Sequence, residues 1–151
     1  MGLESLTLGQ RFNRRVDRTT LPSGLQSLTF GYDFNQGLYS RTLLTGLVNL
    51  PNLPSGLKNL TFGHDFNQSL NHTILPSGLQ TITFGCNFNK SLDGTILPSG
   101  LQNLTFGDHF DQDMDFVLPP GLQALTFGAN FNQRIAKDAL PAGLQTLTLP
   151  K

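Results

Sequence analysis

The chain has 151 residues, with ten basic and ten acidic side chains and a single cysteine. This charge balance argues against binding nucleic acid or a membrane surface through bulk electrostatics. One cysteine excludes an internal disulfide framework and fits a reducing compartment. No secretory signal or membrane-spanning apolar run is recognisable, so we expect one cytoplasmic domain over residues 1–151.

A 22-residue unit, clearest between Leu75 and Ile96, recurs along nearly the whole chain. The leucine that opens it stands at Leu21, Leu53, Leu75, Leu97, Leu118 and Leu140. Repetition with a period of this length is typical of solenoids, in which each unit buries its apolar face against its neighbours. The pattern predicts a β-rich solenoid of about six to seven coils with little helix.

Each unit is expected to contain one short parallel strand. Ile82 and Phe84 alternate with polar or small residues, a pattern that indicates a half-buried strand. A Pro-Ser-Gly turn over 76–78 precedes the strand, and its glycine suits a positive φ. No stretch favours a helix longer than one turn. The predicted strands centre on Leu6, Leu28, Leu60, Ile82, Leu104, Leu125 and Leu147.

The repeat is irregular at its two ends and between Phe34 and Leu53. Incomplete units begin and end the chain, so either the array is longer or its ends associate with those of other copies. A further unit begins on time at Leu43, stops at Pro51 and restarts at Leu53. We expect 57–62 to hold the stacked strand. Residues 41–52 would form an insertion, either a decayed repeat or a functional protrusion.

The consensus L-P-x-x-L-x-x-L-T-F-G-x-x-F-N-x-x-[LIV] resembles the FNIP repeat, a relative of the leucine-rich repeats. The resemblance covers nearly the entire chain. It departs at residues 88–92, Phe-Asn-Lys-Ser-Leu, where the family often carries Ile-Pro. The resemblance implies a right-handed leucine-rich-repeat-like solenoid with a binding role. It implies no settled enzymatic activity.

Residues just after each strand form the predicted binding surface. In leucine-rich-repeat geometry these positions and the outward strand positions line one face. They vary here while their neighbours repeat, which is typical of a recognition surface and also of drift at exposed sites. We therefore expect binding to another protein of unknown identity. The candidate residues are Tyr32, Asp33, His64, Asp65, Asn87, Asp108 and His109.

A column of threonines supports an alternative function. Adjacent strands lie about 4.8 Å apart, so these side chains should form a regular ladder on one face. Flat Thr-x-Thr arrays on β-solenoids resemble ice-binding faces, although few units here complete the pair. A threonine ladder is also ordinary chemistry for an exposed strand. The ladder comprises Thr29, Thr61, Thr83, Thr105 and Thr126.

A column of asparagines follows the second phenylalanine of each unit. We predict a buried ladder that satisfies backbone groups of the coil. Its members are Asn13, Asn35, Asn67, Asn89 and Asn132.

No catalytic motif is present, and we expect no enzyme activity, cofactor or metal. The acidic run Asp111-x-Asp113-x-Asp115 resembles a calcium loop. It has Phe116 where the turn glycine belongs and Leu122 where the bidentate glutamate belongs, which speaks against a calcium site.

Overall fold

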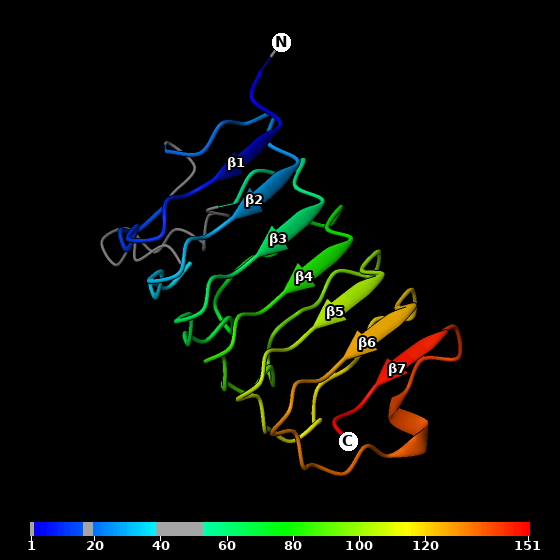
Figure 1. Ribbon diagram of the computed structural model, residues 1–151. Helices are drawn as coiled ribbons and strands as arrows, with labels where there is room; N and C mark the ends of the chain where they lie inside the picture. Colours follow the sequence, from blue (N-terminus) through cyan, green and yellow to red (C-terminus); the bar gives the residue numbers. More distant parts are fainter. Residues whose placement is uncertain (1, 17–19, 39–52) are drawn as a thin grey trace.

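The computed structural model describes residues 2–16, 20–38 and 53–151. Within these residues, seven three-residue strands form one parallel sheet in chain order (Figure 1). The predicted parallel solenoid and all seven predicted strand centres are confirmed. The strands are β1 (Ser5–Thr7), β2 (Ser27–Thr29), β3 (Asn59–Thr61), β4 (Thr81–Thr83), β5 (Asn103–Thr105), β6 (Ala124–Thr126) and β7 (Thr146–Thr148).

The register of the sheet decides between the two candidate strands around the irregular segment. Leu28 of β2 pairs with Leu60 of β3, 32 residues later, and Leu60 pairs with Ile82 after the regular interval. The strand that stacks on β2 is therefore the one within 57–62, as predicted. The predicted insertion at 41–52 lies outside the described residues.

The core consists of columns of apolar side chains that run the length of the solenoid. The central residue of each strand from β2 to β6 is at most 1% exposed. Two phenylalanine columns lie beside it, and rings within one coil stack with centroids 3.9 Å apart, as for Phe84 and Phe88. Phe84 also stacks on Phe106 of the next coil at 5.4 Å. Each coil therefore completes its core only against its neighbours.

The coils are further apart at the second phenylalanine column than beside the sheet. Ring centroids of successive coils are 5.3–5.7 Å apart in the column of Phe84. They are 5.9–6.2 Å apart in the column of Phe88. The coils thus spread with distance from the strands.

The glycine that follows each strand from β2 to β6 is required by close contact between coils. A Cβ on Gly85 would overlap the carbonyl oxygen of Gly63 in the preceding coil. The glycine of the turn before the strand has a different role. Leu79 N–H donates to Pro76 O at 3.1 Å and closes that turn, while Gly78 does not adopt the positive φ expected from the sequence. Among the described residues only Gly94 does, with a φ of 75°.

The ends of the sheet are open in the described structure. The outer edges of β1 and β7 have no strand partner among the described residues, and Leu147 and Leu149 are 38% and 48% exposed. One turn of 3-10 helix, η1 (Lys137–Ala139), precedes β7 and agrees with the expectation of little helix. No helix in the described part of the chain could cross a membrane.

Candidate binding surface

Two side-chain columns follow the strands and together form what we call the post-strand surface. Its outer column is Tyr32, His64, Cys86, Asp108 and Ala129, and its inner column is Asp33, Asp65, Asn87, His109 and Asn130. A backbone ladder holds these columns in place. Each inner-column N–H donates to the outer-column carbonyl one coil earlier, at 2.9–3.0 Å from Asp65 to Asn130. Because the main chain supplies these bonds, the side chains can vary without loss of the coil.

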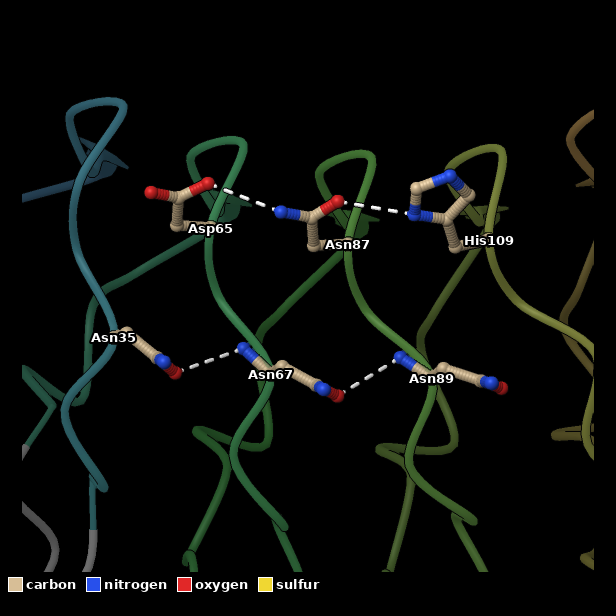
Figure 2. Close-up of a pocket in the computed structure, with 6 residues that line it drawn as sticks. All are labelled: Asn35, Asp65, Asn67, Asn87, Asn89 and His109. Carbon is tan, nitrogen blue, oxygen red and sulfur yellow. Dashed lines mark hydrogen bonds between the residues drawn. The ribbon is translucent and has the colours of Figure 1, made fainter.

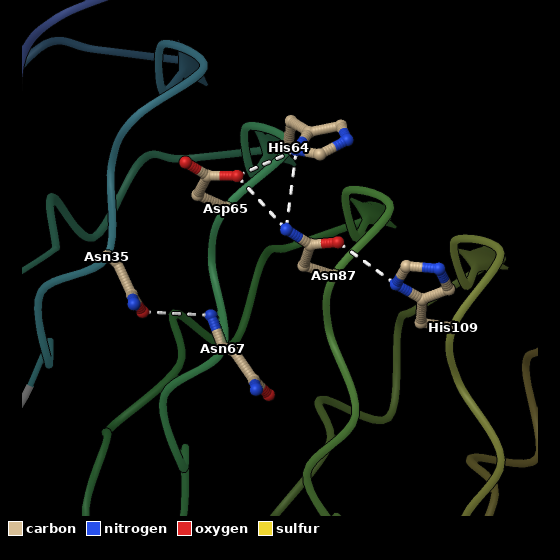
Figure 3. Close-up of polar contacts among 6 residues, drawn as sticks. All are labelled: Asn35, His64, Asp65, Asn67, Asn87 and His109. Carbon is tan, nitrogen blue, oxygen red and sulfur yellow. Dashed lines mark hydrogen bonds and ion pairs between the residues drawn. The ribbon is translucent and has the colours of Figure 1, made fainter.

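A polar chain crosses four coils of the post-strand surface. The rings of Tyr32 and His64 stack with centroids 4.2 Å apart and planes 5° apart. His64 Nδ1 lies 2.7 Å from Asp65 Oδ1, which also accepts from Asn87 Nδ2 at 3.0 Å. Asn87 Oδ1 in turn lies 3.0 Å from His109 Nδ1 (Figure 3). Five of the seven predicted binding residues are thus in one connected arrangement.

This chain of contacts favours a hydrogen on Nδ1 of both histidines. His64 Nδ1 lies 2.7 Å from the Asp65 carboxylate, which only accepts hydrogen bonds, and 3.4 Å from Asn87 Nδ2, which only donates, so the shorter contact favours a hydrogen on His64 Nδ1. Asn87 turns its amide nitrogen to Asp65 and its oxygen to His109, so His109 Nδ1 carries a hydrogen as well. In each neutral ring Nε2 is then a hydrogen-bond acceptor.

The two remaining predicted residues lie on the same surface but outside this chain. Asp33 precedes Asp65 in the inner column, and its N–H donates to Gln10 O at 2.8 Å. Asp108 is exposed in the outer column, where its Oδ1 accepts from Ala129 N–H at 3.3 Å.

A shallow groove runs between the inner column and the asparagine column. Its volume is about 650 Å³, and its lining is mainly amide. Asp65, Asn87 and His109 form one wall and Asn35, Asn67 and Asn89 the other (Figure 2). Such a lining offers hydrogen bonds rather than apolar contact, so the groove suits polar groups of a ligand.

The asparagine column forms a hydrogen-bonded ladder at the surface. Asn67 N–H donates to Asn35 Oδ1 at 2.9 Å, and Asn89 N–H donates to Asn67 Oδ1 at 3.0 Å. The same bond connects the column from Asn13 to Asn132, with Asp111 in the fifth coil. The prediction of a buried ladder is wrong: Asn13 and Asn132 are exposed and the others are half-buried. The preceding phenylalanine occupies the interior, so the amide lies along the outside.

A second amide column supports the first and was not predicted. Gln68 Nε2 donates to Asn35 Oδ1 at 2.9 Å, and Gln112 Nε2 donates to Asn89 Oδ1 at 2.9 Å. Gln36 Nε2 donates to Asn13 Oδ1 at 3.0 Å, and Gln133 Nε2 donates to the carboxylate oxygen Oδ1 of Asp111 at 2.8 Å. The signal is present in the sequence, because a glutamine directly follows the ladder residue in all four cases.

The predicted threonine ladder is in register, but its surroundings are irregular. Thr29, Thr61, Thr83, Thr105 and Thr126 align in successive strands and are half-buried. The neighbouring column runs Ser27, Asn59, Thr81, Asn103 and Ala124, with Asn59 Nδ2 donating to Ser27 Oγ at 3.1 Å. The face is therefore not a uniform threonine array, and nothing in the fold supports ice binding.

In the acidic run, Asp111 is part of the hydrogen-bonded ladder between coils. Asp111 Oδ1 accepts from Asn132 N–H at 2.8 Å and from Gln133 Nε2 at 2.8 Å. Asp113 and Asp115 are exposed. Within the described ranges no three His, Cys, Asp or Glu side chains are grouped so that they could hold a metal ion.

Comparison with known proteins agrees with the repeat architecture. No curated protein matches the chain. The crystal structure of CroV588, described as a novel circular LRR protein structure, matches with 33% identity and a TM-score of 0.73. The match covers 95% of this chain but only 23% of that one. The FNIP Repeat family model matches residues 1–33, 12–43, 50–87, 88–116 and 115–151, and the chain therefore belongs to the FNIP repeat family.

Proposed function

We propose that the protein is a non-enzymatic scaffold that binds a partner protein through the post-strand surface. One observation carries the proposal: side chains change from coil to coil on this surface while the backbone ladder beneath them continues. The repeat family and the leucine-rich-repeat-like solenoid support an interaction role.

The chemistry of the surface indicates how a partner would be held. Tyr32 is 50% exposed and rests on His64, so it offers a rigid aromatic anchor of the kind that dominates interface energies. The groove of the same surface is lined by amides, the Asp65 carboxylate and the His109 ring. These groups suit a polar partner segment rather than an apolar one.

Affinity capture with matched variants tests this proposal. We expect a partner that binds the full chain and is lost from the Tyr32→Ala/His109→Ala variant, because both changes remove surface groups and leave the backbone ladder intact. The same partner should be retained by Lys58→Ala, which alters an exposed residue outside the post-strand surface. The proposal would be contradicted if the double variant retained the partner. It would also be contradicted if no captured protein required the Tyr32 and His109 side chains.

A further inference from the structure

The asparagine wall of the groove carries hydrogen-bond donors that the fold does not use. In Asn35, Asn67 and Asn89 the side-chain oxygen accepts the backbone N–H of the next coil. A backbone N–H only donates, so the other end of each side-chain amide is the nitrogen, which carries two hydrogens. These three nitrogens have no hydrogen-bond partner in the part of the chain that the structure describes. The wall therefore offers equal donors from three successive coils.

The row of free donors ends in the fifth coil. There Asp111 holds the ladder position, and its Oδ1 accepts from Asn132 N–H as an asparagine oxygen would. A carboxylate, however, has no hydrogen to donate. The lining of the groove on this wall ends one coil earlier, at Asn89. Free donors and groove thus occur together in coils two to four (Figure 2).

The opposite wall of the groove contributes a hydrogen-bond acceptor. Asp65 uses Oδ1 for its contacts with His64 and Asn87, and its Oδ2 has no hydrogen-bond partner among the described residues. The residues of both walls are half-buried, apart from the exposed His109. A ligand between the walls therefore meets amide donors on one side and a carboxylate acceptor on the other.

Three equal donors in a row suit a ligand with a row of free acceptors. An α-helix does not provide one, because its backbone carbonyls are bonded within the helix except in the last turn. An extended segment leaves its carbonyls free, and those on one edge recur at every second residue. It also has free N–H groups, which suit the Asp65 carboxylate. The groove therefore matches the main chain of an extended polypeptide better than a helix.

We propose that the groove binds an extended segment of the partner protein, whose backbone carbonyls accept hydrogen bonds from Asn35, Asn67 and Asn89. This inference rests on the partner-binding function proposed above, and it adds the conformation of the bound segment and the atoms that hold it. Each asparagine then has two roles: its oxygen braces the next coil and its nitrogen holds the ligand. Because the contacts go to the main chain, binding depends little on the side chains of the segment.

Titration with a short uncharged peptide tests the proposal directly. The probe is an acetylated and amidated decapeptide of alternating threonine and serine, a composition that does not favour a helix. In proton–nitrogen NMR spectra of the full chain, we expect the side-chain amide signals of Asn35, Asn67 and Asn89 to shift, while that of Asn132 does not. An alanine-rich helical peptide of the same length should leave all four signals in place, because its carbonyls are already bonded.

Matched variants identify the atoms involved. Asn35→Asp/Asn67→Asp removes two donor groups and keeps both acceptor oxygens, as Asp111 does in the native ladder. This variant should bind the peptide about tenfold more weakly. Asn132→Asp makes the same change outside the groove and should bind like the wild-type chain. Unchanged affinity of the double variant would overturn the proposal, and so would a titration in which the groove signals do not shift.

Two further outcomes separate this inference from its alternatives. If cellotetraose, an uncharged linear oligosaccharide, shifted the groove signals and the peptide did not, the ligand would be a glycan and the proposal would be wrong. A captured partner that is lost from Tyr32→Ala/His109→Ala but retained by Asn35→Asp/Asn67→Asp would refute the extended mode of binding alone. A capture in which no protein requires Tyr32 and His109 would refute the proposed function, even if the peptide still bound the groove.

Discussion

The backbone N–H of Asp111 donates to the side-chain oxygen of Asn89 at 3.0 Å, and Gln112 Nε2 donates to the same oxygen at 2.9 Å. One amide oxygen of the fourth coil thus receives two donors from the fifth. Asn67 differs in that Lys90 replaces the glutamine, and its oxygen accepts from Asn89 N–H at 3.0 Å. The ladder is an inter-coil brace whose strength varies along the solenoid.

Asn89→Ala should lower the free energy of unfolding by about 1 kcal/mol, because both donors lose their partner. The effect belongs at the low end of the usual range, since half-exposed donors can bond to water. Asn89→Asp is the matched control: it keeps the acceptor, as Asp111 does one coil later, and should stay near the wild-type value. Urea unfolding midpoints measure both changes. Equal midpoints for the alanine and aspartate variants would show that the ladder contributes nothing.

Gly85→Ala should destabilise the chain by about 1–3 kcal/mol, because the new Cβ overlaps the Gly63 carbonyl oxygen and must push two coils apart. Gly78→Ala is the matched comparison, since a Cβ there meets no atom within 4 Å. That change should be neutral or stabilising by up to about 1 kcal/mol through the unfolded state. Thermal unfolding of both variants measures these two changes in stability. A reversed order would mean that the coils are not in close contact at Gly85.

The neutral forms of His64 and His109 should both carry hydrogen on Nδ1, because Asp65 and Asn87 Oδ1 are acceptors that face that atom. Nitrogen-15 NMR of the imidazole rings distinguishes the two tautomers directly. In Asn87→Ala, His109 should lose its preference for the Nδ1 hydrogen while His64 keeps it. Nε2-protonated rings in the wild-type protein would show that the polar chain does not form in solution.

Regular spacing makes the fold predictable, whereas side-chain direction outside the strands is harder to infer. Leu60 can be chosen as the partner of Leu28 because the unit after it runs in full, and the register confirms this. The asparagine column is predicted to be buried because a repeated amide beside a buried phenylalanine resembles a core feature. The exposure of Ile96 has no signal in the sequence, because an aliphatic residue before a core leucine also looks buried. The side chains of Asn89 and Ile96 lie toward the outside, because their neighbours Phe88 and Leu97 already fill the interior.

The sequence predicts where the residues of the candidate site lie, but not which side chains contact each other. The repeat register alone places Tyr32, His64 and Asn87 after their strands. Their contacts depend on the distance between coils, which brings the Tyr32 and His64 rings to 4.2 Å and Asn87 within 3.0 Å of Asp65. Those distances follow from stacking in three dimensions, because the residues concerned are 22 or more positions apart in the chain.

Hydroxyl-radical footprinting of the chain bound to its captured partner tests the central claim most directly. Tyr32, His64, Cys86 and His109 all react readily with such radicals and all lie on the post-strand surface. We expect labelling of these four side chains to fall on complex formation, while labelling of Ile96 and Val117 stays unchanged. Unchanged labelling of the four residues in a saturated complex would contradict binding through the post-strand surface.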